Sequence, residues 1–319
     1  MTLHAATAAA ATAPAPPGRR RYHHVRRPRR GTAIPYAFVA PAFLLLLAFG
    51  VLPILVAAVV STTNLNISGL ADPSNVKFIG VDNYIRLARD PGFWDALTNT
   101  GLFAVVGVPS IIVASLGVAL LLHRSNGRFA SALRAFYFMP AITAIVAVAL
   151  VWGYLYNSQF GLFNYLLSLV GLGPVQWLSD PTVAKGSVAL VAIWRATGLN
   201  IVIFLAALQG IPKEYLEAAA IDGANERQRT FRITIPLLRF AIFFVTITTV
   251  INWLQFFDEP YVLTQGGPAG ATTSISLYIF QEGFRFNQFG FASAGSVVLF
   301  VIIAVITLVQ LRMRGNDVD

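Results

Sequence analysis

Cysteine is absent from this 319-residue chain, and charged residues are scarce. Without cysteine there are no disulfides and no thiolate metal ligands, so disulfide scaffolds and cysteine-based zinc sites are excluded. Only 12% of the residues are charged, whereas a soluble domain has about 25%. So little charge cannot cover a surface that faces water on all sides.

Patterns that carry catalytic chemistry are also missing. The histidines fall in the tails or beside an apolar run and show no metal-ligand spacing: His4, His23, His24 and His123. No glycine-rich loop of the kind that cradles phosphate occurs, and no nucleophile stands in a pattern with a base. The sequence therefore predicts a chain that is not an enzyme and that binds no metal or cofactor of its own.

Long apolar runs take the place of charge, since 56% of the residues are hydrophobic. A run of about 20 apolar residues is long enough to cross the roughly 30 Å core of a bilayer. Six such runs occur, at residues 35–61, 99–122, 135–157, 186–209, 237–257 and 290–311. A buried core helix would account for one run but not for six. The sequence therefore predicts an all-α polytopic membrane protein with six transmembrane helices.

The distribution of lysine and arginine predicts the orientation, because cytoplasmic loops retain these residues. Most of them lie in the tail before the first run, in the second-to-third and fourth-to-fifth connections, and at the C-terminal end: Arg19, Arg20, Arg21, Arg26, Arg27, Arg29, Arg30, Arg124, Arg128, Arg134, Lys213, Arg227, Arg229, Arg232, Arg239, Arg312 and Arg314. The alternating connections hold Lys77, Arg86, Arg89, Lys185 and Arg285. Both termini and the fourth-to-fifth connection are therefore predicted to be cytoplasmic.

The net charge of +9 and the segment RRRYHHVRRPRR suggest nucleic-acid binding as a second class. Positive residues beside a first span also orient it and meet anionic lipid headgroups, and this interpretation is the better one here. The chain starts with Ala/Pro-rich low complexity, so residues 1–33 are predicted to be a disordered basic tail. The apolar stretch that follows is too long for a signal peptide. The six-span domain is placed at residues 34–312 and a short second tail at 313–319.

A polar, helix-prone module interrupts the apolar runs at residues 212–236. Its first part, Lys213 to Asp222, is made mostly of good helix formers, and Gly223 gives freedom for a sharp turn. Asn225 is placed to cap a second helix, with Gln228 in the position that completes a capping box. The pattern predicts two short helices that bend at Gly223. Their shape alone fits a structural hairpin as well as a docking element.

The residues of this module resemble the EAA motif, E-A-A-x-x-D-G-A, which marks the permease subunits of ATP-binding-cassette importers. The match is carried by Glu217, Ala218, Ala219, Asp222, Gly223 and Ala224, with Phe231, Ile233 and Pro236 further on and Ile235 in place of the usual leucine. The resemblance implies a coupling helix that docks on an ATPase subunit. It also implies a second permease subunit, an ATPase dimer that holds ATP and magnesium, an extracytoplasmic solute-binding protein, and the cytoplasmic membrane of a bacterium or archaeon.

Three further stretches resemble the carbohydrate-uptake branch of that family, in which the maltose and glycerol-3-phosphate permeases belong. They lie at residues 78–100, 161–181 and 256–272. The extra N-terminal spans and the large outer domain of the maltose subunit are missing here. Within the importer class, a sugar is expected as the solute, and glycerol-3-phosphate or a glycerophosphodiester is the alternative. An ion-coupled carrier or a channel is a different class that does not explain the EAA spacing.

Arg195 is the only charged residue well inside a predicted span. Such residues are costly in a membrane and mark pathways by default, although an arginine can also lock two helices by pairing with a carboxylate. By resemblance to the maltose permease, the substrate pathway includes Arg195, Leu199, Thr249, Trp253 and Phe256, and Asn252 is expected on the same helix face. The maltose subunit has asparagines at the positions of Trp253 and Phe256, so specificity does not carry over. Asp258 and Glu259 fit a solvated loop end, and the resemblance implies that this outer loop lies near the docked binding protein.

Overall fold

The computed structural model of the chain describes residues 33–124 and 128–315. Of the predicted tails, residues 1–32 and 316–319 lie outside this range. The chain divides into two compact units, one up to Leu52 and one from Pro53 onward. In the first unit, α1 (Ala33–Leu46) continues into a π-helical segment, Leu47–Val51.

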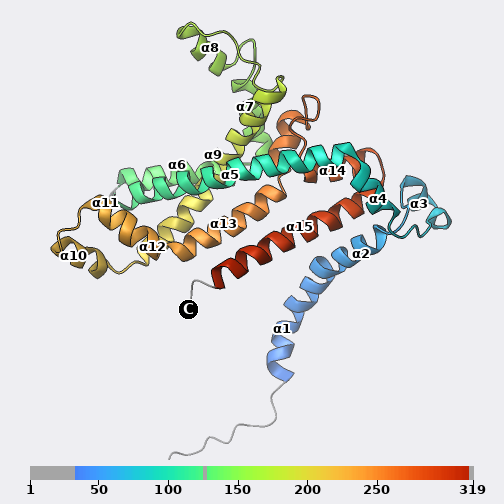
Figure 1. The fold of residues 1–319 in the computed structure, drawn as a ribbon, viewed down its shortest axis with the longest axis horizontal. Coiled ribbons are helices and arrows are strands. Elements are labelled where there is room, and N and C mark those ends of the chain that lie inside the picture. Colours follow the sequence, from blue (N-terminus) through green and yellow to red (C-terminus); the bar gives the residue numbers. More distant parts are fainter. Residues whose placement is uncertain (1–32, 125–127, 316–319) are drawn as a thin grey trace, which may run out of the picture. The chain divides into compact units, whose positions relative to one another are not determined.

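The rest of the described chain is helical apart from turns and connections, which confirms the all-α prediction (Figure 1). The helices are α2 (Leu52–Val60), α3 (Ile67–Ala71), α4 (Asp82–Arg89), α5 (Pro91–Arg124), α6 (Arg128–Ile142), α7 (Ile145–Leu155), α8 (Leu162–Leu169), α9 (Pro181–Gln209), α10 (Lys213–Ile221), α11 (Glu226–Arg229), α12 (Ile235–Leu237), α13 (Arg239–Leu254), α14 (Ile275–Phe280) and α15 (Phe289–Gly315). Further π-helical segments occur at Thr230–Thr234, Pro260–Thr264 and Gln281–Arg285.

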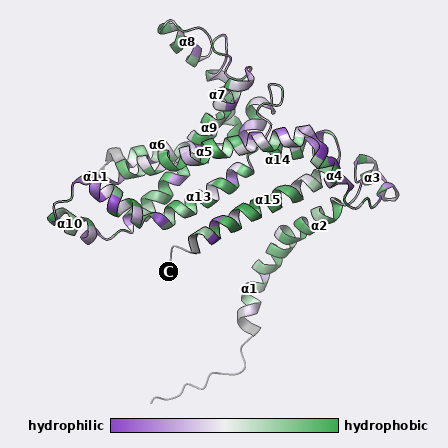
Figure 2. Ribbon diagram, in the orientation of Figure 1, coloured by the Kyte–Doolittle hydropathy of each residue, from purple (hydrophilic) through white to green (hydrophobic). Residues whose placement is uncertain are grey.

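Four helical stretches are long and apolar enough to cross a membrane in one piece: Tyr36–Val60, Pro91–Arg124, Pro181–Gln209 and Phe289–Met313. The third predicted span is a broken pair, Ser131–Ile142 with Ile145–Leu155, and the fifth falls on Arg239–Leu254, which forms a second broken pair with Glu226–Leu237 from the module. The chain reaches six spans when each pair counts as one. Figure 2 shows hydrophobic residues along the long helices and hydrophilic ones gathered around α10, α11 and α4.

The third predicted span is the most strongly altered, because its two halves meet at an angle of 100°. Pro140 lies near the end of α6 and has no backbone N–H to donate to the preceding turn. The hydroxyl of Thr143 donates to the Met139 carbonyl at 2.8 Å, and Ala144 has the extended ψ of 130° with which α7 begins. These local features end one helix and start the next inside a single apolar run.

The core of the second unit lies between α5, α9 and α13, which pack against one another. Ala119, Phe204 and Val245, one from each helix, are fully buried in a shared apolar cluster. On α9, Gly198 lies directly against the Tyr137 carbonyl of α6, where a Cβ atom would collide with the backbone. Small residues of this kind let membrane helices approach closely. The packing holds α9 between α5 and α6 and fixes the position of its polar side chains.

Candidate functional site

The predicted bend of the module is present, and its backbone explains the glycine. Gly223 has a φ of +79°, a conformation that side-chain-bearing residues rarely adopt. The N–H of Gly223 donates to the Ala220 carbonyl at 3.1 Å, and that of Ala224 to the Ala219 carbonyl at 2.9 Å. This pair of bonds is the Schellman ending of a helix. It stops α10 and reverses the chain within two residues.

The second short helix begins as the sequence predicts. The Asn225 side chain accepts from the Gln228 N–H at 2.9 Å, and the Gln228 side chain accepts from the Asn225 N–H at 2.9 Å, so the capping box is complete. The helix runs through Pro236, and the chain bends by 63° only between Leu237 and Arg239.

The predicted coupling residues lie on the surface of the second unit. Glu217, Ala218, Asp222 and Gly223 are exposed, and Ala219 and Ala224 are half-buried. Two large apolar side chains of α10 are also open to the surroundings, with Tyr215 57% and Ile221 87% exposed. Tyr215 and Ile221 thus add apolar surface beside the residues of the motif.

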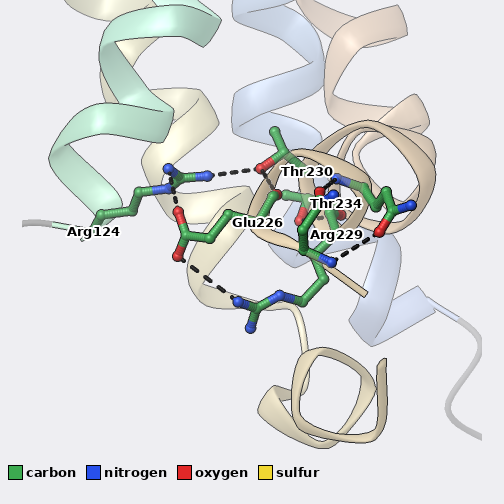
Figure 3. Close-up of polar contacts among 7 residues, drawn as sticks. Arg124, Glu226, Arg229, Thr230 and Thr234 are labelled. Atoms are coloured by element: carbon green, nitrogen blue, oxygen red, sulfur yellow. Dashed lines mark hydrogen bonds and ion pairs between the residues drawn. The ribbon is translucent and has the colours of Figure 1, made fainter. Parts of the chain in front are cut away.

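A polar cluster connects the module to α5 (Figure 3). Arg124, the last residue of α5, forms an ion pair with Glu226 at 2.8 Å and donates to the Thr230 hydroxyl at 2.7 Å. Arg229 approaches the other oxygen of Glu226 at 3.8 Å. Glu226 therefore lies between two guanidinium groups, one on α5 and one on its own helix. A cavity of about 300 Å³ opens beside this cluster, between the ends of α5 and α9 and the start of α10.

A second and larger cavity, of about 510 Å³, lies between α9 and the C-terminal end of α13. Arg195 of α9 lines it together with two carboxylates from the segment after α13. The Nε of Arg195 donates to Glu259 Oε1 at 2.7 Å, and its Nη2 approaches Asp258 Oδ2 at 3.4 Å. The Glu259 side chain is 2% exposed, whereas that of Asp258 is 51% exposed. The expectation of a solvated loop end is therefore wrong for Glu259, which is buried and paired with Arg195.

The remaining predicted pathway residues separate into two sets. Leu199, Asn252 and Phe256 line the cavity with Arg195. Thr249 and Trp253 do not line it. They are each 4% exposed, and Trp253 packs against Phe103 and Gly107 of α5. Asn252 was expected on the same helix face as Thr249 and Trp253, and this expectation is wrong, because only Asn252 of the three lines the cavity.

Sequence reasoning missed several polar residues of the cavity wall. Asn200, Thr248 and Gln255 line it in addition to the two carboxylates. A signal for Gln255 and Thr248 was present, because with Asn252 they lie at intervals of three and four residues, which is one face of a helix. No group of three or more potential metal ligands occurs among the residues that the structure describes.

Comparison with known proteins agrees with this architecture. A family model described as "Binding-protein-dependent transport system inner membrane component" matches residues 85–314. The chain is 38% identical over 279 residues to the lactose transport system permease protein of Rhizobium radiobacter, which covers 86% of this chain and 92% of that protein. It is 34% identical over 285 residues to the trehalose/maltose transport system permease protein of Thermococcus litoralis. That alignment covers 89% of this chain and 94% of that protein.

A solved structure shares the fold. It is a chain of a bacterial ABC transporter involved in the import of the acidic polysaccharide alginate, with a TM-score of 0.78, 23% identity, and coverage of 90% of this chain and 96% of that chain. The predicted membership of a permease family is confirmed by the family match and by the relatives. The chain belongs to the family of binding-protein-dependent transport system inner membrane components.

Proposed function

We propose that this chain is one permease subunit of an ATP-binding-cassette importer for a carbohydrate. It forms half of the translocation pathway and pairs with a second permease subunit. A dimer of ATPase subunits, which holds ATP and magnesium, docks on the module at residues 212–236, and an extracytoplasmic binding protein delivers the solute. The module and both termini face the cytoplasm. The relatives named for lactose and for trehalose and maltose support a sugar as the solute.

One structural observation carries this proposal. The module is the direct connection between α9 and α13, and these two helices also contribute the walls of the larger cavity, through Arg195 on α9 and Asn252 on α13. A partner that displaces the module therefore displaces both walls. Ile221, the last residue of α10, is 87% exposed. Its exposure supports docking, because a large apolar side chain gains free energy when a partner covers it.

The cavity wall also supports a hydroxyl-rich solute. Asn252 and Gln255 are exposed and line the cavity, so their amides offer both donors and acceptors. Phe257, which lines the same cavity, offers an aromatic face on which the apolar side of a sugar ring can stack.

Reconstitution of the assembled complex in vesicles tests the proposal. Uptake of a labelled oligosaccharide should require ATP, the binding protein and this chain, and the chain alone should hydrolyse no ATP. Glu217→Lys, on the exposed face of α10, should lower the binding-protein-stimulated ATPase activity by at least about tenfold, since a broken charge pair at an interface costs several kcal/mol. Glu214→Lys, in the first turn of α10, is the matched charge reversal outside the motif and should have a smaller effect. ATP hydrolysis by the purified chain, or normal coupling in Glu217→Lys, would contradict the proposal.

A further inference from the structure

We propose that Arg195, Asp258 and Glu259 form a charge filter, which makes this chain's wall of the larger cavity net negative. Because of it, the pathway accepts uncharged glycans and excludes uronates, sulfonated sugars and sugar phosphates. The inference rests on the proposed function, since it names the charge class of the solute that such a permease carries.

The charge of the wall follows from its ionisable residues. Among the side chains that line the cavity, one is cationic and two are acidic: Arg195, Asp258 and Glu259. The arginine is paired with both carboxylates, at 2.7 Å and 3.4 Å. One positive charge against two negative ones leaves a net charge of minus one on the wall.

The arrangement of the pairs decides whether Arg195 can serve as a binding site for anions. Its Nε is bonded to Glu259, and Glu259 is buried, so this bond cannot open without leaving an unpaired charge inside the protein. Its Nη2 faces Asp258, which is half-exposed. An incoming anion would have to displace one carboxylate while it approaches the other. A guanidinium that already holds two carboxylates attracts a third anionic group weakly.

An uncharged glycan, in contrast to an anion, can form favourable hydrogen bonds with this wall. The exposed oxygen atoms of Asp258 accept hydrogen bonds from hydroxyl groups, and bonds that involve a charged partner are stronger than neutral ones. The guanidinium of Arg195 has five N–H groups, of which the two carboxylates engage two, so the others remain to donate to hydroxyl oxygens. The amides of Asn252 and Gln255 complete a wall without a free cation.

Family membership leaves the charge of the solute undecided. One relative is named for lactose, whereas a solved importer of the same fold takes up an acidic polysaccharide. The two differ in the charge of the named solute, although both share this fold. Membership of the family therefore does not fix the charge class of the solute, and the larger cavity is where this chain places its ion-paired arginine.

The absence of cysteine allows a direct measurement of the potential in the cavity. Asn252→Cys places the single thiol of this chain on the wall, in the assembled complex with cysteine-free partner subunits. The rates of its reaction with a cationic trimethylammonium methanethiosulfonate and an anionic sulfonate methanethiosulfonate are measured at low ionic strength by intact mass. Each rate is divided by the rate of the same reagent with free 2-mercaptoethanol. The cationic reagent should be favoured by about tenfold, which one net charge about 6 Å away produces even at the dielectric constant of water.

Charge variants in the same background identify the source of the potential. Asp258→Asn and Glu259→Gln should each reduce the preference to about threefold or less, since the wall then has no net charge. Asp258 is half-exposed, so its variant is expected to fold even if the Glu259 variant does not. Equal rates in the Asn252→Cys complex, a preference for the anionic reagent, or a preference that Asp258→Asn leaves unchanged would overturn the proposal.

Uptake separates this inference from the proposed function. Vesicles that hold the complex are offered an uncharged oligosaccharide and its uronate counterpart, each with the binding protein saturated. Uptake of the uncharged sugar at least about tenfold faster supports the filter. Uptake of both at similar rates overturns the filter and leaves the permease function standing. Uptake of neither refutes the proposed sugar transport, whereas the thiol reaction rates still report the potential of the wall.

Discussion

Gly223 determines how α10 joins α11, because its φ of +79° places it in the left-handed region. A Cβ atom there would meet no other atom within 4 Å, so the cost of a side chain is conformational and not steric. Gly223→Ala should therefore cost about 1–2 kcal/mol and reorient α11, while Gly223→Asn should cost less, because asparagine tolerates this region. The measurement is the amount of ATPase subunit that copurifies and its stimulation by the loaded binding protein.

Gly210 gives the matched control for this prediction. It ends α9 with a φ of −78°, which any residue adopts, so Gly210→Ala should leave assembly nearly unchanged. If the two alanine variants behave alike, the left-handed turn has no part in coupling.

The ion pair of Arg195 and Glu259 gives a second prediction at single residues. Arg195→Ala leaves the buried Glu259 carboxylate without its partner, which should cost about 3–5 kcal/mol of stability. Glu259→Gln in addition should restore most of this loss, since the remaining amide carries no charge. Thermal unfolding of the purified complex measures both effects in a double-mutant cycle. If the single and double variants unfold at the same temperature, the pair does not stabilise the fold.

These residues also show what the sequence can predict. The turn at Gly223 and the capping box of Asn225 with Gln228 depend on neighbours a few residues apart, so local chemistry was sufficient to predict them. The pairing of Arg195 with Glu259 joins positions 64 residues apart. No periodicity connects them, and an acidic pair before a proline is typical of a loop. Only the packing of α9 against α13 brings the two side chains together.

At the level of helices, the contact between α5 and α11 should transmit movement of the module. Arg124 and Glu226 are 49% and 67% exposed, so their pair contributes at most about 1 kcal/mol to stability. Glu226→Ala should therefore leave the unfolding temperature nearly unchanged while it raises the number of ATP molecules hydrolysed per solute transported. The ratio of ATPase rate to uptake rate measures this coupling.

Charge reversal gives the control for this contact. Arg124→Glu combined with Glu226→Arg restores an ion pair in which the acidic side chain lies on α5 and the basic one on α11. This double variant should recover part of the coupling that either single reversal loses. Equal coupling in both single reversals and in the native complex would show that α5 takes no part in transmission.

The helices show a second limit of sequence reasoning. Apolar runs predicted the positions of the spans, because length and composition are properties of the run itself. They did not predict the break between α6 and α7 or the bend after Leu237. Both lie inside or beside an apolar run. Hydropathy indicates whether a helix lies in an apolar environment, but it does not indicate the direction of the helix axis. Pro236 lies close to the second bend, since the helix continues past it for one further residue.

For the whole molecule, orientation in the membrane is the property that the basic residues predict. Reporter domains fused after Arg128 and after Arg229 should lie in the cytoplasm, and those after Asp72 and Gly270 outside. The length of α9 allows its ends to lie on opposite sides, because its 29 residues extend about 43 Å, which exceeds the membrane core. Protease accessibility in vesicles of known orientation is the second measurement. A cytoplasmic reporter after Asp72 would reverse the predicted orientation. The module would then lie outside the cell, where it could not contact the ATPase subunit.

The unbroken length of α9 and α13 has a mechanical consequence. From Arg195 to Gln209 the helix extends about 21 Å, and from Arg239 to Asn252 it extends about 20 Å. The two helices are thus lever arms of nearly equal length, with the module joined to one end of each and the cavity at the other. A push of about 4 Å on the module would turn each arm by about 10°. Because the two arms are nearly equal, α9 and α13 would tilt by the same angle. The two cavity walls would then change their tilt without sliding past each other along the helix axes.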